Sequence, residues 1–391
     1  MEVRSQTDMA KEKDLECIIE KEELLRCLYL VQGVVEKRSS LPILSHVLIE
    51  GLDETVSLGA TDLEIGIRQQ CKATVKKDGA VTTDARKLYE IVRELPPERL
   101  VLRSSGEGWV EVSSGRSRFR MASFDPKEFP AITPTAGQKE EKKVPISISL
   151  SGKILGEMIE KTLFAASPDE SRLNLNGVYL ETQPNEKIRF VSSDGHRLSI
   201  IEREAKIANT DDFPHVILPR KGLVEARKLL EKDEEETDLS LHGATAVLRK
   251  GTTELLMRLV EGEFPDYQQV MPKDKKNFIS FSREEFLGAV RRLLVLTTER
   301  ARGVKLQVEK EKMIVSVNTP DLGEGVEEIE IENAGPNLII GFNGRYLTEV
   351  LNVLNEGAKI NLYLKDEVSP GLLQTQEDEN FSYIIMPMRI F

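Results

Sequence analysis

Apolar residues recur at helical spacing in six segments of the chain, arranged as three pairs. In the second segment they recur at i, i+3, i+4 and i+7, from Leu88 to Leu95, and Pro96 ends the helix. The last segment repeats this stripe, and the fourth carries a looser version whose opposite face is basic. The six expected helices cover residues 21–36, 85–96, 151–167, 219–232, 282–299 and 344–357.

Strand-like segments and polar turns follow the first helix of each pair in the same order. Segments in which apolar and polar residues alternate occupy residues 41–50, 173–181 and 302–309. The polar turns that come next contain Asp62, Asp194 and Asp321. Further on, the sequences KEFPAI and GEFPDY place Pro130 and Pro265 at comparable points, each just before a linker. The common order indicates an internal repeat.

Three copies of one strand–helix unit, each of about 125 residues, account for the length of 391 residues. We expect three similar α+β domains, each with two helices packed on antiparallel sheet. Charged segments poor in apolar residues, 135–145 and 271–277, are the expected linkers. The expected domains cover residues 15–138, 146–272 and 278–391, after a polar extension at residues 1–14 that we expect to be disordered.

The charge balance and the cysteines narrow the class of protein. A net charge of −12, from 66 acidic and 54 basic residues, argues against a protein coated with nucleic acid but allows a locally basic surface. Cys17, Cys27 and Cys71 form no CxxC pair, which fits a reducing cytosol. Neither a signal peptide nor a run long enough to span a bilayer is present, so we expect a cytoplasmic protein without a membrane partner.

The sequence SSDGHR, residues 192–197, places Asp194 and His196 on either side of Gly195. An Asp-Gly pair between two strand-like runs predicts a two-residue hairpin turn in which Asp194 bonds its own backbone. The alternative is an acid–base pair of an enzyme such as a hydrolase, although no third group completes a triad. No metal-ligand spacing and no phosphate-binding loop occurs, so we expect neither metal nor cofactor.

The end of the chain, YIIMPMRIF, alternates apolar residues up to Phe391. We expect an edge strand that carries Ile384 and Ile385 and stops near Pro387, because proline cannot donate to a strand ladder. The Met-Pro-Met sequence suggests an adaptable apolar surface, since thioether side chains repack around different partners.

The sequences SSDGHRLS, FPDY, RSSLPIL, PRKG, GRSRF and YIIMPMRI together resemble the bacterial sliding clamp, the beta subunit of DNA polymerase III. The resemblance covers residues 15–391 in order. It implies the DNA clamp fold: three similar domains per chain, closing as a ring-shaped homodimer around double-stranded DNA of any sequence. It implies a processivity factor without chemistry of its own. The implied partners are the DNA polymerase III core and other polymerases, an ATP-dependent clamp loader and repair proteins.

The resemblance also assigns three sets of residues. A hydrophobic pocket for partner peptides would comprise Leu175, Ser193, Gly195, His196, Arg197, Leu198, Pro265, Val270, Ile384, Met386, Pro387, Met388, Arg389 and Ile390. The DNA-facing residues would be Arg38, Arg86, Lys87, Arg172, Arg220, Lys221, Arg292 and Arg302. The dimer interface would pair Arg116, Arg118 and Phe119 with the partner copy's Val295, Leu296, Glu324, Glu327 and Glu328. Gln268 and Gln269 stand where relatives commonly have a base, and Phe391 extends beyond the usual end.

Two other functions remain open from the sequence. An enzyme that uses Asp194 and His196 would show turnover that His196→Ala abolishes. A three-domain scaffold that binds peptides but never DNA would lack a concave surface on which the basic residues converge.

Overall fold

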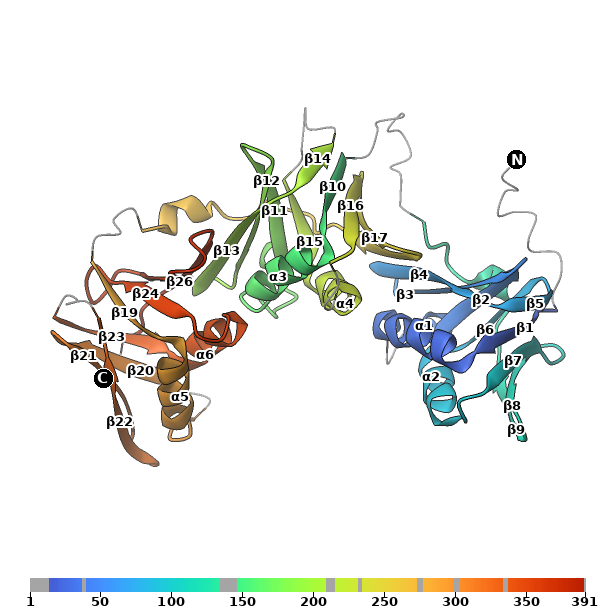
Figure 1. Ribbon diagram of the computed structural model, residues 1–391, viewed down its shortest axis with the longest axis horizontal. Helices are drawn as coiled ribbons and strands as arrows, with labels where there is room; N and C mark the ends of the chain where they lie inside the picture. The colour runs from blue at the N-terminus through green and yellow to red at the C-terminus, as the bar shows by residue number, and fades with distance from the viewer. Residues whose placement is uncertain are drawn as a thin grey trace. The chain divides into compact units, whose positions relative to one another are not determined.

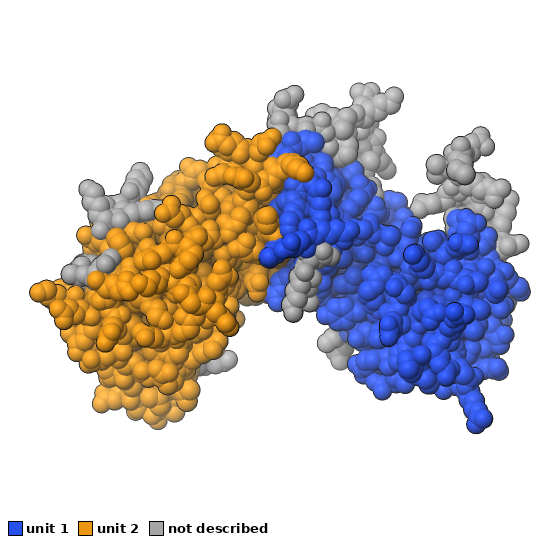
Figure 2. Space-filling view, in the orientation of Figure 1, with its two compact units in different colours: residues 1–153, 207–212, 221–259 blue, residues 154–206, 213–220, 260–391 orange. Residues whose placement is uncertain are grey.

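The computed structural model describes residues 14–36, 40–133, 146–208, 215–230, 234–272, 277–298, 302–332 and 337–389. Four of our expectations therefore lie outside the described residues: those for the extension at residues 1–13, for Arg38, for the linker at residues 135–145, and for Ile390 with Phe391. The chain forms two compact units (Figure 2). Unit 1 comprises residues 1–153, 207–212 and 221–259, and unit 2 comprises residues 154–206, 213–220 and 260–391.

Three repeats follow one another along the chain (Figure 1). The first contains β1 (Glu16–Glu20), α1 (Lys21–Val34), β2 (His46–Leu52), β3 (Thr55–Thr61), β4 (Ile65–Lys72), β5 (Thr74–Lys77), β6 (Gly79–Asp84), α2 (Ala85–Glu94), β7 (Arg99–Ser104), β8 (Trp109–Ser114) and β9 (Ser117–Ala122). The second contains β10 (Ile146–Ser151), α3 (Gly152–Leu163), β11 (Gly177–Gln183), β12 (Lys187–Ser193), β13 (Arg197–Glu204), β14 (Lys206–Ala208), β15 (Val216–Pro219), α4 (Arg220–Leu230), β16 (Glu236–His242), β17 (Thr245–Lys250) and β18 (Thr253–Arg258). The third contains β19 (Phe278–Ser282), α5 (Arg283–Leu294), β20 (Gly303–Val308), β21 (Lys312–Thr319), β22 (Gly323–Glu330), β23 (Leu338–Asn343), α6 (Gly344–Val353), β24 (Lys359–Tyr363), β25 (Gly371–Thr375) and β26 (Phe381–Ile385).

The six expected helices are all present, and their apolar stripes are buried. In α2 the stripe residues Leu88, Val92 and Leu95 are buried, and in α6 the equivalent stripe is buried as well. Polar caps start three of these helices: Asp84 Oδ1 accepts the N–H of Lys87 (2.8 Å), Asn343 Oδ1 accepts that of Arg345 (3.0 Å), and Ser282 Oγ accepts that of Glu285 (3.4 Å). α1 packs beside α2, and α5 beside α6 (Figure 1). The prediction of two helices on antiparallel sheet in each domain is confirmed.

Two of the expected strands start differently from the prediction. Residues Pro42–Ser45 and Leu173–Leu175 form 3₁₀ helices, and regular strand begins only at His46 and Gly177. At the first position, proline fixes φ near the helical value and donates no N–H, which favours a short helical turn over a ladder. Of the apolar residues there, Leu44 is buried, whereas Leu41 and Leu173 are exposed, so the alternation corresponds neither to a strand nor to a buried face.

Each unit contains one long antiparallel sheet that joins two repeats. In unit 1 the strand order is β14-β10-β16-β17-β18-β4-β3-β2-β6, and in unit 2 it is β15-β11-β12-β13-β26-β25-β24-β19. The repeats join where β18 pairs with β4 and where β13 pairs with β26. Two shorter sheets remain, with the orders β5-β1-β7-β8-β9 and β22-β21-β20-β23. Strands β9 and β22 are therefore sheet edges.

Candidate functional site

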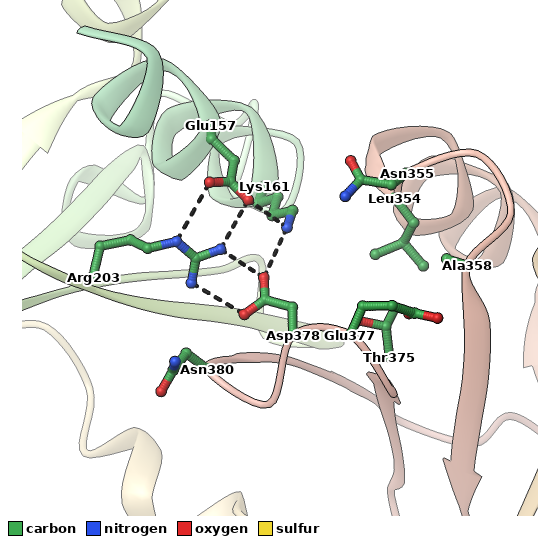
Figure 3. Close-up of a pocket in the computed structure, with 10 residues that line it drawn as sticks. All are labelled: Glu157, Lys161, Arg203, Leu354, Asn355, Ala358, Thr375, Glu377, Asp378 and Asn380. Carbon is green, nitrogen blue, oxygen red and sulfur yellow. Dashed lines mark hydrogen bonds and ion pairs between the residues drawn. The ribbon is translucent and has the colours of Figure 1, made fainter. Parts of the chain in front are cut away.

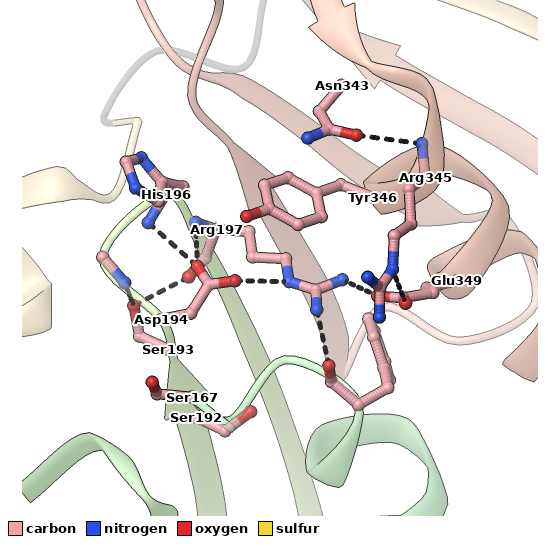
Figure 4. Close-up of polar contacts among 12 residues, drawn as sticks. Ser167, Ser192, Ser193, Asp194, His196, Arg197, Asn343, Arg345, Tyr346 and Glu349 are labelled. Atoms are coloured by element: carbon pink, nitrogen blue, oxygen red, sulfur yellow. Dashed lines mark hydrogen bonds and ion pairs between the residues drawn. The ribbon is translucent and has the colours of Figure 1, made fainter. Parts of the chain in front are cut away.

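The turn between β12 and β13 is held by Asp194 (Figure 4). Its Oδ1 accepts the backbone N–H groups of His196 (2.9 Å) and Arg197 (3.1 Å). Gly195 has φ of +90°, a conformation that glycine adopts without steric cost. The turn and the backbone bonding of Asp194 are confirmed, but three residues separate the strands instead of two. The side-chain bonds to two successive N–H groups require the longer loop.

Arg197 anchors this turn to the third repeat. Its Nε donates to Asp194 Oδ2 (3.0 Å), its Nη1 bonds Glu349 of α6, and its guanidinium lies 4.2 Å from the ring centroid of Tyr346. Burial alone would lower the pKa of Arg197, but the surrounding negative charge, that of Glu349 included, keeps it above its ordinary value. The carboxylate of Asp194 thus serves this ion pair and the backbone, not the imidazole of His196.

The C-terminal segment lies directly beside this turn. β26 ends at Ile385, two residues before Pro387, as predicted, but it is an interior strand between β13 and β25 and not an edge strand. The prediction of an edge strand was wrong because β13 pairs with the side of β26 that we expected to be free. The sequence assigns β13 to another domain. Beyond the strand, Met386 donates its N–H to the carbonyl of His196 (2.9 Å) and Met388 donates to that of Gly341 (2.9 Å).

An apolar cluster forms the floor between the turn and the tail. Its buried members are Val191, Leu198, Ile200, Tyr267, Leu372 and Ile384, and Tyr179, Phe264, Val270, Met271 and Tyr363 pack against it half-buried. Above it, Met388 is 38% exposed. Asn174 Nδ2 donates to the carbonyl of Glu263 (3.1 Å), which brings the segments of Leu175 and Pro265 together. All the described pocket residues lie in unit 2.

Three of the basic residues that we expected to face DNA are engaged with acidic neighbours. Lys87 Nζ lies 2.8 Å from Glu90, and Arg292 Nε lies 2.7 Å from Glu327. Lys221 bonds the carboxylate of Asp62, which is buried at the junction with β4. The i, i+3 spacing of Lys87 and Glu90 could have predicted the first pair. The partners of Lys221 and Arg292 come from distant segments that the sequence does not connect.

Two other described bases of this set, Arg86 and Arg172, bond backbone carbonyls through their guanidinium groups, whereas Arg220 and Arg302 form hydrogen bonds through their own backbones. Arg86 Nη2 donates to the carbonyl of Val35 (2.9 Å), and Arg172 Nη1 donates to that of Asp194 (3.2 Å). The backbone N–H of Arg220 donates to Asn176. The backbone carbonyl of Arg302 accepts from Gly344.

The residues expected at the dimer interface lie on or near the two edge strands. On β9, Phe119 is 40% exposed and Arg118 lies 3.4 Å from Glu111 of β8. Near β22, Val295 is 79% exposed, and Glu328 pairs with Lys312 (2.9 Å). The sequence analysis missed Val326, which is 64% exposed on β22. Val326 could have been recognised from the sequence because it is an apolar residue within the acidic segment GEGVEEIE.

Comparison with known proteins resolves the family. Residues 15–133, 149–266 and 268–389 match, in turn, the N-terminal, central and C-terminal domains of the DNA polymerase III beta subunit. The chain belongs to the beta sliding clamp family. It is 35% identical to the beta sliding clamp of Caulobacter vibrioides, over 95% of this chain and 99% of that protein. It is 36% identical to the clamp of Pseudomonas putida, with the same coverage.

Solved sliding clamps have the same fold. The clamp of C. crescentus, crystallised with polyethylene glycol at a proposed beta-motif tethering region, superposes with a TM-score of 0.89 at 33% identity, over 97% of this chain and 100% of that one. The clamp of Bartonella birtlesii bound to griselimycin also gives 0.89, at 31% identity over 96% of this chain and 100% of that one.

The family determines the general function. A sliding clamp binds DNA and polymerases as a processivity factor and has no catalytic activity of its own. The interpretation of Asp194 and His196 as a hydrolase pair is therefore wrong, as is that of a scaffold which never binds DNA. Within the described part of the chain, no helix is long and apolar enough to cross a membrane, and no cluster of His, Cys, Asp or Glu could hold a metal ion.

Proposed function

We propose that two copies of this chain close head to tail into a ring, through pairing of β9 of one copy with β22 of the other. The observation that carries the proposal is the way in which the repeats already join within the chain. β4, β13 and β22 each follow the aspartate-containing turn of their repeat, and β9, β18 and β26 are each the last strand of theirs. β18 pairs with β4 and β26 with β13, so β9 and β22 are left as the equivalent unpaired edges.

The internal joint in unit 1 supplies an expected register for the joint between copies. β9 and β18 both begin after a tight turn, at Ser117 and Thr253, and Thr253 lies opposite Gln69 of β4. Gln69 is the fourth residue of β4 that pairs with β3, counted from the turn before β4. Val326 is the fourth residue of β22 that pairs with β21, counted in the same way, so the two positions are equivalent. We therefore expect Ser117 opposite the partner's Val326. The same register brings Arg116 opposite the partner's Glu327, and Phe119 adds apolar contact beside the partner's exposed Val295.

A cysteine pair tests this register. Directly opposite Cα atoms in an antiparallel ladder lie about 4.5–5.5 Å apart, within the range of a disulfide. We expect Ser117→Cys combined with Val326→Cys to give a covalent dimer on mild oxidation, seen on a non-reducing gel. Ser117→Cys combined with Glu324→Cys is the matched control, because it is out of register by two residues. Equal cross-linking of both pairs, or of neither, would contradict the proposed joint.

We propose that the ring holds duplex DNA by enclosure, with weak and sequence-independent attraction to phosphates. The acid partners of Lys87, Lys221 and Arg292 support this, because they reduce the positive field that a tight DNA-binding surface would need. Loaded onto nicked circular DNA, the protein should remain bound at high salt and leave once the DNA is linearised. Equal release from circular and linear DNA would refute enclosure.

We propose that the turn at Asp194, the Leu175 and Pro265 segments and the Met386–Arg389 tail bind a short extended segment of polymerases and other partners. The apolar floor beneath them favours Leu or Phe anchors, each worth roughly 1.5–3 kcal/mol when buried. Met388→Ala should reduce the affinity for such a peptide and leave the dimer intact. Clamp-loader and repair proteins, and a cytoplasmic location, are part of the same proposal.

A further inference from the structure

Four charged side chains form a compact cluster where the second repeat meets the third within unit 2 (Figure 3). We call it the ion quartet: Glu157 and Lys161 of α3, Arg203 of β13, and Asp378 of the turn between β25 and β26. Lys161 Nζ lies 2.6 Å from Glu157 Oε1 and 2.9 Å from Asp378 Oδ2. Arg203 Nη2 lies 2.8 Å from Glu157 Oε1 and 2.6 Å from Asp378 Oδ2. Each cation thus bridges both carboxylates.

The quartet is largely buried, although the side chain of Glu157 is 36% exposed, and all four residues line a pocket of about 300 Å³. The side chain of Lys161 is only 5% exposed, and its ammonium also lies 5.3 Å from the ring centroid of Phe381. Burial alone would raise the pKa of Asp378, but the hydrogen bonds from Arg203 and Lys161 outweigh it and hold that pKa below its ordinary value. Buried ion pairs add little net stability but strongly disfavour any geometry in which one partner is lost.

The position of the quartet on the sheet indicates its role. Side chains alternate between the two faces of a strand, so Arg197 and Arg203 of β13 share the face that packs on the helices. The opposite face carries Leu198 and Ile200, which belong to the apolar floor of the proposed pocket. Arg197 lies opposite Ile385, at the end of β26, and the quartet lies beyond Phe381, at its start. The two ends of the paired segment are therefore both fixed by buried ions.

We infer that the ion quartet is a positioning device that fixes β26 against β13 and so presents the Met386–Arg389 tail to partner peptides. This rests on the proposed function of the tail as a wall of the pocket. No quartet residue belongs to that wall. They act through β26, whose next residue, Met386, donates its N–H to His196 in the opposite wall. If the start of β26 shifts, this bond and the width of the pocket change with it.

Amide hydrogen exchange tests the inference without any partner. Asp378→Asn keeps the size of the side chain but removes the charge that both cations share. We expect faster exchange of the Met386 and Met388 amides in this variant, with unchanged exchange in β11 and β12. Arg249→Gln is the matched control, because Arg249 forms an exposed pair with Glu254 in the β17–β18 hairpin of unit 1. Unchanged exchange at Met386 and Met388 in Asp378→Asn would overturn the inference.

Peptide affinity provides the second measurement, with a fluorescein-labelled extended peptide that carries one Leu and one Phe anchor. We expect Asp378→Asn to weaken binding by about fivefold to tenfold, while Arg249→Gln leaves it unchanged. The conservative variant Asp378→Glu, which keeps the negative charge that both cations share, should recover at least half of the loss. If the wild-type protein fails to bind the peptide, the proposed pocket fails, and the exchange experiment still decides the role of the quartet.

Discussion

The two internal joints of the chain share one backbone design but differ in what covers them. In each, five residue pairs of two strands from different repeats form an antiparallel ladder, β18 with β4 in unit 1 and β26 with β13 in unit 2. The segment that leaves the preceding repeat packs next to each ladder. It carries Phe129 and Pro130 in unit 1, and Phe264 and Pro265 in unit 2.

In unit 1 this segment closes the joint. Phe129 and Ile132 are buried with Val247 and Leu256, and a side chain added at Gly66 would approach Ile132 Cγ2 to 2.9 Å. In unit 2 the corresponding cluster is equally buried, but Pro265 beside it is exposed and Met388 of the tail is 38% exposed. Under the proposed function, the same joint is thus a sealed structural contact in one unit and the floor of an open site in the other. The ion quartet and Arg197 supply the rigidity that a closing apolar cover supplies in unit 1.

The largest effect is expected from Tyr383→Ala, which empties the centre of the joint in unit 2. Tyr383 is fully buried on β26, and truncation of a buried aromatic residue costs about 3–5 kcal/mol. Unit 2 should unfold at lower denaturant concentration and peptide binding should disappear. Calorimetry reports both units, whereas fluorescence reports unit 1, because Trp109 is the only tryptophan of the chain. A fluorescence transition shifted as far as the calorimetric one would contradict separate joints.

A smaller effect is expected when the cover of the unit 1 joint is removed. Phe129→Ala should lower the free energy of unfolding of unit 1 by roughly 3 kcal/mol and expose Val247 and Leu256. The Trp109 fluorescence transition in urea measures this loss, and binding of an apolar dye reports the new opening. Phe264→Ala is the matched control: it should weaken peptide binding and leave the Trp109 transition in place. If the two variants gave the same pattern, the contrast between a sealed and an open joint would be lost.

The sequence predicted the repeats well because each helix carries its own signal. The stripe of α2 and the cap at Asp84 are local features, and the turn at Asp194 follows from the Asp-Gly pair. The joints were not predictable in this way. That β26 lies inside a sheet, and that Lys221 bonds Asp62, depends on segments far apart in the chain. The candidate pocket came from resemblance, and Tyr267 of the apolar cluster was not assigned to it, although Tyr267 belongs to FPDY, one of the sequences that carry the resemblance.

Acid should weaken the quartet and distinguish the two joints. The pKa values of Glu157 and Asp378 are held below their ordinary range, for although burial raises them, the hydrogen bonds of Arg203 and Lys161 lower them by more. Groups with lowered pKa values stabilise the fold above the unfolded value, about 4, and this contribution is lost as pH falls through the lowered one. The melting temperature of unit 2 should therefore fall more steeply below about pH 4 in the wild type than in Asp378→Asn. Parallel curves for the two proteins would show that Asp378 does not contribute.

The smallest effects on stability are expected for the ion pair of Lys221 with Asp62 in the unit 1 joint. They distinguish Lys221, which we expect to be structural, from Lys87, which we expect to face DNA. Lys221 bonds Asp62, whose side chain is fully buried, so Lys221→Met leaves that carboxylate without its cation and should lower the stability of unit 1, by less than Phe129→Ala does. Since its ammonium is held by that carboxylate, the salt dependence of binding to a short linear duplex should not change. Lys87→Met should leave stability unchanged and reduce the slope of log affinity against log salt by about 0.9, the value for one lost phosphate contact. A reduced slope for Lys221→Met would show that Lys221 contacts DNA phosphate. The unit 1 joint would then be stabilised by its apolar cover and not by the ion pair.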